Sequence, residues 1–210
     1  MTDTPRIQAV VLAGGDSERF GDGDKALADL DGRPLLAHVL DAVAAATDPV
    51  PILAVATDRQ SERLARTLGL DANDLTVVTD APSLDGPLSG LLAAARRSSS
   101  RWLLGCGCDM PLVTVDAVEA LVGRVAADVD AVVPVVAGHD QPMLALYRRD
   151  RVLELATELG SQGPRGLLDR LDRVERVDAA GVESSLASAV TNVNTREELE
   201  RVRRRVDDRR

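Results

Sequence analysis

The stretch LAGGDSERFGDGDKA, residues 12–26, follows the apolar run IQAVV and contains Lys25, the only lysine of the chain. Gly14 and Gly15 allow the backbone to approach a ligand and to adopt positive φ, so that amide N–H groups can point at phosphate oxygens. Arg19 and Lys25 can neutralise phosphate charge, the arginine through a fork of donors and the lysine as a compact point charge. The stretch therefore predicts a strand that ends in a phosphate-binding loop.

The lone lysine is the feature that separates this loop from an ordinary surface turn. The chain has 25 lysines and arginines together, and chance would place a single lysine at this position about one time in 25. The loop lacks the GK[ST] ending of a P-loop and the GxGxxG spacing of a dinucleotide-binding fold. Taken alone, it also fits a turn rich in glycine and aspartate, so the rest of the chain has to decide.

The bulk composition predicts one acidic domain. The chain has 210 residues, of which 45% are hydrophobic and 1% aromatic, and its net charge is -9. This length supports one domain with its own core, built from Val, Leu and Ala. The acidic balance argues against a nucleic-acid partner held by phosphate neutralisation. Abundant aspartate with almost no lysine is typical of adaptation to concentrated salt.

Neither end of the chain suggests targeting. The N-terminus MTDTPRIQAVV lacks the basic stretch and long apolar segment of a signal peptide. No apolar run approaches the roughly 20 residues that a membrane-spanning helix needs. We therefore expect a cytoplasmic protein without a membrane partner.

Two cysteines, Cys106 and Cys108, are the only cysteines of the chain. They lie two residues apart in an apolar run that is typical of a strand, so they point to the same face. Two ligands are too few for a zinc site. The pair is best interpreted as small residues packed at the end of a strand.

Apolar runs of strand length alternate with helical patterns along the chain. The runs are continuous or nearly so, as in strands buried on both faces. They lie at 7–13, 51–57, 75–79, 101–107, 130–136 and 142–147. Helical spacing recurs at 34–46, 59–69, 87–97 and 114–126. The alternation predicts an α/β fold of the Rossmann-like type, with a mostly parallel central sheet and helices on both faces.

The loops that follow the strands are where a site is expected, because ligands of such sheets bind beyond the carboxyl ends of the strands. Three of these loops, and a fourth segment before the last helix, carry glycine, proline, carboxylate or carboxamide groups. They read AGGDSERFGDGDKA, DAPSLDGPLSG, CDMPLV and TNVNTREEL. Together they predict a site for a phosphorylated ligand and a metal.

The motifs in these segments resemble those of the nucleotidyltransferase superfamily, whose opening reads LAGG-x-S-x-R-[MF]-G-x-x-K. They are most similar to the molybdenum cofactor guanylyltransferases, the MobA family, where GxPLLxHV, a GPLxG turn, a DMP turn and a late NxNT follow. This chain has GRPLLAHV at 32–39, GPLSG at 86–90, DMP at 109–111 and NVNT at 192–195. The resemblance implies a single nucleotidyltransferase domain over residues 1–210.

The resemblance also implies an activity. It is the transfer of GMP from GTP to the terminal phosphate of molybdopterin or Mo-molybdopterin, with release of pyrophosphate. Mg²⁺ is the implied cofactor, and other maturation proteins of the molybdenum cofactor are implied partners. The acceptor oxygen is already anionic at neutral pH, so no catalytic base is required and catalysis rests on positioning and charge stabilisation.

The functional positions of the family map onto individual residues of this chain. Those implied to bind the nucleotide are Leu12, Ala13, Gly14, Gly15, Lys25, Asp80 and Asp109. Those implied in catalysis are Arg19, Lys25 and Asp109. Asp109 would bind Mg²⁺, a hard cation that prefers carboxylate and phosphate oxygens. Asn192 and Asn194 are candidates for the acceptor side. Asp85 competes with Asp80 as the carboxylate that contacts the nucleotide.

Structural roles compete with several of these assignments. Asp109 also fits a residue that caps the helix expected at 114. Asn192 and Asn194 also fit turn and capping positions, ahead of a capping box formed by Thr195 and Glu198. The two roles of the asparagines are compatible with each other.

Three further polar residues have no role implied by the motifs, although His38 lies within GRPLLAHV. His38 fits a packed position on a helix, and His139 lies in a loop that could reach the acceptor. The segment 158–177 falls in the half of the chain where the family places its acceptor side. Within it, Arg165 in the turn GPRG fits either an anion contact or the start of a helix.

Other functions remain open from the sequence. Within the superfamily they are a molybdopterin cytidylyltransferase and a guanylyltransferase for a cobamide or deazaflavin precursor. A sugar-phosphate enzyme fits less well, because its GTR-x-x-P-x-T-x-x-x-PK opening is replaced here by SERFGDGDKA. A non-catalytic nucleotide-binding module is the alternative from another class, and the joint presence of Arg19, Lys25 and Asp109 argues against it.

Overall fold

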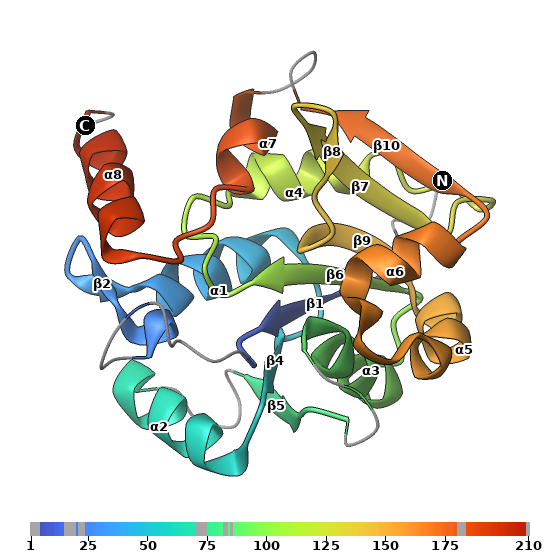
Figure 1. Ribbon diagram of the computed structural model, residues 1–210, viewed down its shortest axis with the longest axis horizontal. Coiled ribbons are helices and arrows are strands. Elements are labelled where there is room, and N and C mark those ends of the chain that lie inside the picture. The colour runs from blue at the N-terminus through green and yellow to red at the C-terminus, as the bar shows by residue number, and fades with distance from the viewer. Residues whose placement is uncertain are drawn as a thin grey trace.

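The computed structural model describes residues 5–14, 20, 24–69, 75–81, 84, 86–179 and 184–208. Its main sheet has the strand order β10-β7-β9-β6-β1-β4-β5, and β8 pairs with β7 (Figure 1). The strands of this sheet are β1 (Ile7–Leu12), β4 (Ile52–Val55), β5 (Thr76–Thr79), β6 (Trp102–Gly107), β7 (Ala131–Val136), β8 (His139–Asp140), β9 (Leu144–Arg148) and β10 (Val174–Asp178). A separate hairpin pairs β2 (Asp29–Leu30) with β3 (Arg33–Pro34).

The direction of the strands confirms the prediction of a mostly parallel sheet. β1 is parallel to both of its neighbours, β4 and β6. The pairs β4 with β5 and β7 with β10 are parallel as well. β9, which forms from the apolar run at 142–147, is antiparallel to both β6 and β7. An apolar run that is buried on both faces does not encode strand direction, which is why β9 was not recognisable as antiparallel.

The described residues form the four predicted helices and further ones. They are α1 (Leu35–Ala46), α2 (Asp58–Leu68), α3 (Pro87–Arg97), α4 (Val115–Val122), α5 (Arg149–Leu159), α6 (Gly163–Arg170), α7 (Ser184–Ala189) and α8 (Arg196–Asp207), with short 3-10 turns η2 (Lys25–Leu27) and η3 (Gly160–Gln162). The helix expected at 114–126 is shorter, because it is capped by Thr114 and ends before Gly123. Within the described ranges, no helix has both the length and the apolar character needed to cross a bilayer.

Two hydrophobic cores sandwich the sheet. Alternate side chains of β1 enter opposite cores: Ala9 and Val11 join one, Val10 and Leu12 the other. The first core includes residues of α1, α4 and α7, and the second includes residues of α3, α5 and α6. This alternation follows from the two-residue period of a strand, and it confirms that helices cover both faces of the sheet.

A third, smaller cluster fastens the C-terminal helix to the carboxyl edge of the sheet. Its buried members are Phe20, Leu30, Leu35, Leu112, Val193, Leu199 and Val202. They come from the segment after β1, the β2–β3 hairpin, the start of α1, the segment after β6, and α8 with the residues before it. Figure 1 shows α8 standing beside the β2 hairpin. The C-terminal helix is thereby packed against Phe20, in the segment that follows β1.

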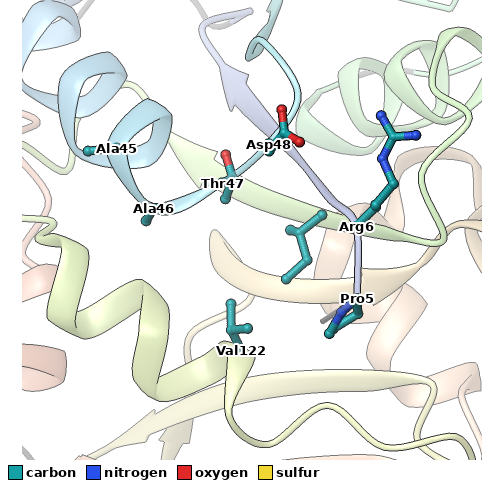
Figure 2. A pocket seen from close by; sticks show the side chains of 8 residues that line it. Pro5, Arg6, Ala45, Ala46, Thr47, Asp48 and Val122 are labelled. Atoms are coloured by element: carbon teal, nitrogen blue, oxygen red, sulfur yellow. The ribbon is translucent and has the colours of Figure 1, made fainter. Parts of the chain in front are cut away.

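A hollow of about 340 Å³ lies at the opposite, amino edge of the sheet (Figure 2). It is formed by the start of β1, the end of α1 with the residues after it, and the end of α4. Its lining residues are Pro5, Arg6, Ile7, Ala45, Ala46, Thr47, Asp48 and Val122. Since parallel α/β sheets bind their ligands beyond the carboxyl ends of the strands, this hollow lies on the wrong edge for the expected site.

Candidate functional site

Three polar side chains from distant parts of the chain meet at the carboxyl edge of the sheet. The Nζ of Lys25 lies 2.6 Å from the Oδ2 of Asp109 and donates a hydrogen bond of 3.1 Å to the Oδ1 of Asn194. Lys25 begins η2, Asp109 follows β6, and Asn194 precedes α8. The structure thus brings together a cation suited to phosphate, a carboxylate suited to a metal, and an amide.

The position of Asp109 is set by its backbone neighbours. Its carbonyl accepts a hydrogen bond of 2.8 Å from the N–H of Val193, which ties the turn after β6 to the C-terminal segment. The N–H of Cys108 donates to the carbonyl of Leu12 over 3.1 Å, which ties the same turn to the end of β1. A Cβ atom at position 107 would lie 2.6 Å from the Oδ1 of Asp109. Gly107 is therefore required if the carboxylate is to keep this orientation.

Asn194 is held by the start of α8. The hydroxyl of Thr195 accepts from the N–H of Glu198, whose carboxylate accepts from the N–H groups of both Asn194 and Thr195. The capping box predicted from the sequence is thereby confirmed. The asparagine next to it in the motif, Asn192, is exposed. Of the two acceptor-side candidates, Asn194 is the one whose side chain touches Lys25.

Lys25 owes its position to the residue before it. The Oδ1 of Asp24 accepts from the N–H of Ala26 and caps η2. The carboxylate of Asp24 also lies 3.6 Å from Arg63 of α2. Asp24 was not recognised as a site residue from the sequence. Its signal is the aspartate directly before a short helical turn, which is a favoured N-cap position.

The Lys25–Asp109 pair has consequences for a metal. Its side chains are 20% and 16% exposed, so the pair is partly screened by solvent. Mg²⁺ usually binds proteins through one or two carboxylates and takes further ligands from water and substrate phosphates. The described residues contain no group of three or more His, Cys, Asp or Glu side chains placed to hold a metal. A single carboxylate such as Asp109 is a donor suited to a divalent cation that brings further ligands from a nucleotide and water.

A second carboxyl group, that of Asp80, lies where β5 ends. A Cβ atom at Gly14 would come within 2.8 Å of its Oδ2, and one at Gly90 within 3.2 Å of its Oδ1. Two glycines therefore let the backbone of β1's loop and of α3 lie directly against this group. Burial raises the pKa of the Asp80 carboxyl above its ordinary value. None of the described residues donates a hydrogen bond to it, and its oxygens have the chemistry to accept from a ligand.

The nucleotide-loop residues show how the end of β1 is fixed. The N–H of Ala13 donates to the carbonyl of Ala54 over 2.8 Å, which continues the pairing of β1 with β4. The carbonyl of Ala13 accepts from the side chain of Gln60 over 2.9 Å. Three residues singled out by the sequence, Gly15, Arg19 and Asp85, lie outside the described residues.

The remaining polar candidates take structural positions. The Nε2 of His38 lies 2.9 Å from the carbonyl oxygen of Leu30, as expected of a packed helix residue. His139 is exposed in the β7–β8 hairpin. Arg165 is exposed in the first turn of α6, so the GPRG turn does start a helix. A contact of Arg165 with an acceptor anion stays a prediction.

The two cysteines are expected to be unreactive in the folded protein. Both are buried, and burial raises the pKa of the Cys108 thiol from 9.0 to about 12 and that of the Cys106 thiol further above its ordinary range. Since the thiolate is the reactive form, a thiol reagent at pH 8 should label neither cysteine before unfolding and both in denaturant. Rapid labelling of the native protein, followed by mass spectrometry, would contradict this packing.

The raised thiol pKa values also set the sign of a pH effect. Between pH 9 and about 12 the unfolded chain loses the Cys108 proton and the folded chain keeps it. The contribution of this thiol to the free energy of unfolding is therefore complete below pH 9 and is lost as the pH rises toward 12. The cysteines, interpreted from the sequence as packed strand residues, are confirmed in that role.

Comparison with known proteins places this arrangement in a family. Residues 9–174 match the model of the MobA-like NTP transferase domain. The molybdenum cofactor guanylyltransferase of Rhodopseudomonas palustris (strain HaA2) is 37% identical over 154 residues, which are 70% of this chain and 68% of that protein. The probable molybdenum cofactor guanylyltransferase of Bacillus cereus (strain AH820) is 30% identical over 196 residues, 92% of this chain and 94% of that protein.

Solved structures show the same fold. Molybdopterin-guanine dinucleotide biosynthesis protein A from Archaeoglobus fulgidus superimposes with a TM-score of 0.76 at 24% identity, over 96% of this chain and 99% of that one. A nucleotidyl transferase from Methanothermobacter, Mth528, gives a TM-score of 0.79 at 19% identity, over 98% of this chain and 99% of that one. At these identities the superpositions establish the architecture alone.

Proposed function

The chain belongs to the MobA-like NTP transferase family, and we propose on this basis that it transfers GMP from GTP to the terminal phosphate of molybdopterin or Mo-molybdopterin. Pyrophosphate is the second product. The observation that carries the proposal is the 2.6 Å approach of Lys25 to Asp109 at the carboxyl edge of the sheet. A nucleotidyltransferase needs a cation for phosphate oxygens and a carboxylate for a metal at one point, and these residues supply both.

The chain's own residues would act by positioning and by charge stabilisation. An oxygen of the acceptor phosphate attacks the α-phosphorus of GTP, and the bond from this phosphorus to the bridging oxygen of the β-phosphate breaks. Pyrophosphate leaves with that electron pair. Since the attacking oxygen is already anionic, no residue has to remove a proton. Lys25 and Arg19 would offset the charge that builds up on the transferred and leaving phosphates.

Asp109 would hold Mg²⁺ when nucleotide is bound. The bound ion would neutralise phosphate charge during the transfer. Lys25 occupies the Oδ2 of Asp109, so the ammonium group and the metal would share this carboxylate. The entry of nucleotide phosphates offers Lys25 new anionic partners at the same place, and Asn194 keeps its Nζ within reach.

Asp80 favours guanine as the base. A carboxylate is an acceptor with two oxygens, and guanine presents two adjacent donors, N1–H and the 2-amino group. Cytosine presents one donor, its 4-amino group, beside the acceptor N3, so it cannot satisfy both oxygens. The Asp80 carboxyl, flanked by Gly14 and Gly90, thus supports GTP over the CTP of a cytidylyltransferase.

The acceptor side is proposed at the segment before α8. Asn194 and the exposed Asn192 lie on the segment that leads into α8, next to Lys25. Carboxamides there could hold the acceptor phosphate in line with the α-phosphorus. We also propose that the enzyme works in the cytoplasm as one domain over residues 1–210, and that other maturation proteins of the cofactor deliver or receive its ligands.

The experiment that tests this function compares nucleotides directly. Purified protein in molar KCl, chosen for its acidic composition, is given Mg²⁺ and molybdopterin with GTP, CTP, ATP or UTP, and pyrophosphate release is measured. We expect release with GTP alone. Release with CTP would move the protein to the cytidylyl branch, and binding of GTP without release would favour the non-catalytic module.

A further inference from the structure

The pairing of β1 with β4 is interrupted at its carboxyl end by a side chain. Its last bond runs from the N–H of Ala13 to the carbonyl of Ala54. In a parallel ladder, the next bond would run from the N–H of Ala56 to the carbonyl of Ala13. Instead, the Oε1 of Gln60 accepts from Ala56 over 3.0 Å and its Nε2 donates to Ala13 over 2.9 Å. The carboxamide occupies the place of the missing bond.

The Gln60 carboxamide therefore bridges the two strands at this point. A carboxamide is a planar group with a carbonyl acceptor and N–H donors, much like a peptide group. Both backbone groups bond to the carboxamide, so a side chain takes the place of the direct bond between them. This bridge lies directly before Gly14 and before α2.

Gln60 is itself held in place by the start of α2. Thr57 is the N-cap, and its hydroxyl accepts from the N–H of Gln60 over 3.2 Å. A glutamine at this third helical position ordinarily turns back to the N–H of the N-cap residue. Here it bonds one residue further back, to Ala56, and continues to β1. Both its donor and its acceptor are used, which a glutamate cannot reproduce.

The bridge through Gln60 matters because of what lies beside it. A Cβ atom at Gly14 would lie 3.2 Å from the nitrogen of Ala56 and 2.8 Å from the Oδ2 of Asp80. Gly14 therefore lies directly beside the residue that follows β4 and beside the carboxyl group that follows β5. The distance from Gly14 to Asp80 depends on how far β1 stands from β4.

We propose that Gln60 is a positioning residue of the nucleotide site, which sets the spacing between Gly14 and Asp80 by separating β1 from β4. Its consequence for the base rests on the proposed function, in which Asp80 receives the two donors of guanine. Without the inserted carboxamide, Ala56 can bond directly to Ala13 and the loop that follows β1 moves relative to Asp80.

The test compares Gln60→Ala and Gln60→Glu with a control. Alanine removes the inserted group, and glutamate keeps the acceptor for Ala56 but places an oxygen against the carbonyl of Ala13. Both variants should raise KM for GTP by about tenfold or more, with kcat within about threefold of wild type. The control Glu62→Gln, an exposed position on the same helix, should match wild type.

The preference of the enzyme for one base over another distinguishes a positioning role of Gln60 from a mere loss of folded protein. Inosine triphosphate lacks the 2-amino group, so the wild-type preference for GTP over it measures the contact with Asp80. We expect both Gln60 variants to narrow that preference by about tenfold, which simple destabilisation would not do. Unchanged KM and preference, or a fall in kcat alone, would overturn the proposal.

A crystal structure of Gln60→Ala tests, independently of activity, whether Gln60 separates β1 from β4. Closure of β1 onto β4, with a hydrogen bond from Ala56 to Ala13, supports the proposal, and an unchanged gap overturns it. If wild-type protein shows no use of GTP, the proposed function fails, and this structure still decides whether Gln60 separates the strands.

Discussion

Replacing Asp109 with alanine is expected to lower turnover by roughly 10³-fold, with the fold intact. The change removes the carboxylate at which Lys25 and the C-terminal segment converge, and with it the only oxygen ligand for Mg²⁺ that we assign to the site. Stability should change little, because the Lys25–Asp109 pair is partly exposed and such pairs contribute little to folding. The measurement is pyrophosphate release at saturating GTP and Mg²⁺, beside a thermal unfolding curve.

Two companion variants make the Asp109 result specific. Asp109→Asn keeps the shape of the side chain and loses its charge, so it should be nearly as impaired as alanine if the carboxylate binds a metal. Glu119→Ala removes an exposed carboxylate of α4 and should behave as wild type. Since Thr114 and not Asp109 caps α4, near-normal turnover of Asp109→Asn at the same Mg²⁺ concentration would show that Asp109 acts only as a partner of Lys25.

Replacing Asp80 with asparagine is expected to exchange the preferred base. Asparagine offers one acceptor and one donor, which clash with the paired donors of guanine. Xanthine carries a carbonyl in place of the 2-amino group, so its N1–H and its O2 match asparagine. We expect kcat/KM for GTP to fall by about 10²–10⁴-fold, because a buried polar group is left unpaired. We expect xanthosine triphosphate to become the better substrate in the same assay.

The pKa of Asp80 provides a control on stability. Burial raises the pKa of this carboxyl in the folded state, so the folded protein favours the protonated form more than the unfolded chain does. The carboxyl therefore contributes stability at low pH and loses that contribution as the pH rises through its raised pKa. Asp80→Asn should consequently unfold no earlier than wild type at neutral pH, and a loss of GTP use cannot be attributed to unfolding.

A matched variant resolves the competition between two carboxylates. Asp85 follows Asp80 in the same loop and was the alternative contact for the nucleotide. Asp85→Asn should leave the preference for GTP unchanged. If instead this variant accepts xanthosine triphosphate and Asp80→Asn does not, the assignment of the base contact to Asp80 is wrong.

The central strands and their helices could be predicted because burial on both faces leaves an unmistakable run of apolar residues. β1 and β6 are the clearest cases, since every residue in them is buried. β10 was missed because VERVD, at the edge of the sheet, mixes charged and apolar residues. The two-residue strands β2, β3 and β8 are too short to show any period. α5 was not predicted. For α6 the sequence left open whether the GPRG turn starts a helix or contacts an anion, and the structure shows a helix start.

Those residues of the candidate site that lie at strand ends or in motifs could be predicted from the sequence. Asp80 and Asp109 directly follow apolar runs, and Lys25 is unique in the chain. The bond between Lys25 and Asn194 was not predictable, because nothing local relates residues 169 positions apart. Gln60 was missed although Thr57 and Gln60 have the spacing of a capping box. The pattern predicts a helix start, and the partner on β1 appears only in three dimensions.

The bond between Lys25 and Asn194 implies an order of events at the ribosome. Lys25 emerges early, Asp109 follows 84 residues later and Asn194 169 residues later. At typical elongation rates of 5–20 residues per second, roughly 10–30 s separate the first and last of these arrivals. During that interval a nascent chain can shape the loop after β1, but it has no C-terminal segment to close over it. The complete site can therefore form only after α8 has been synthesised and has docked. Truncated messages that end before α8 yield chains without the complete site.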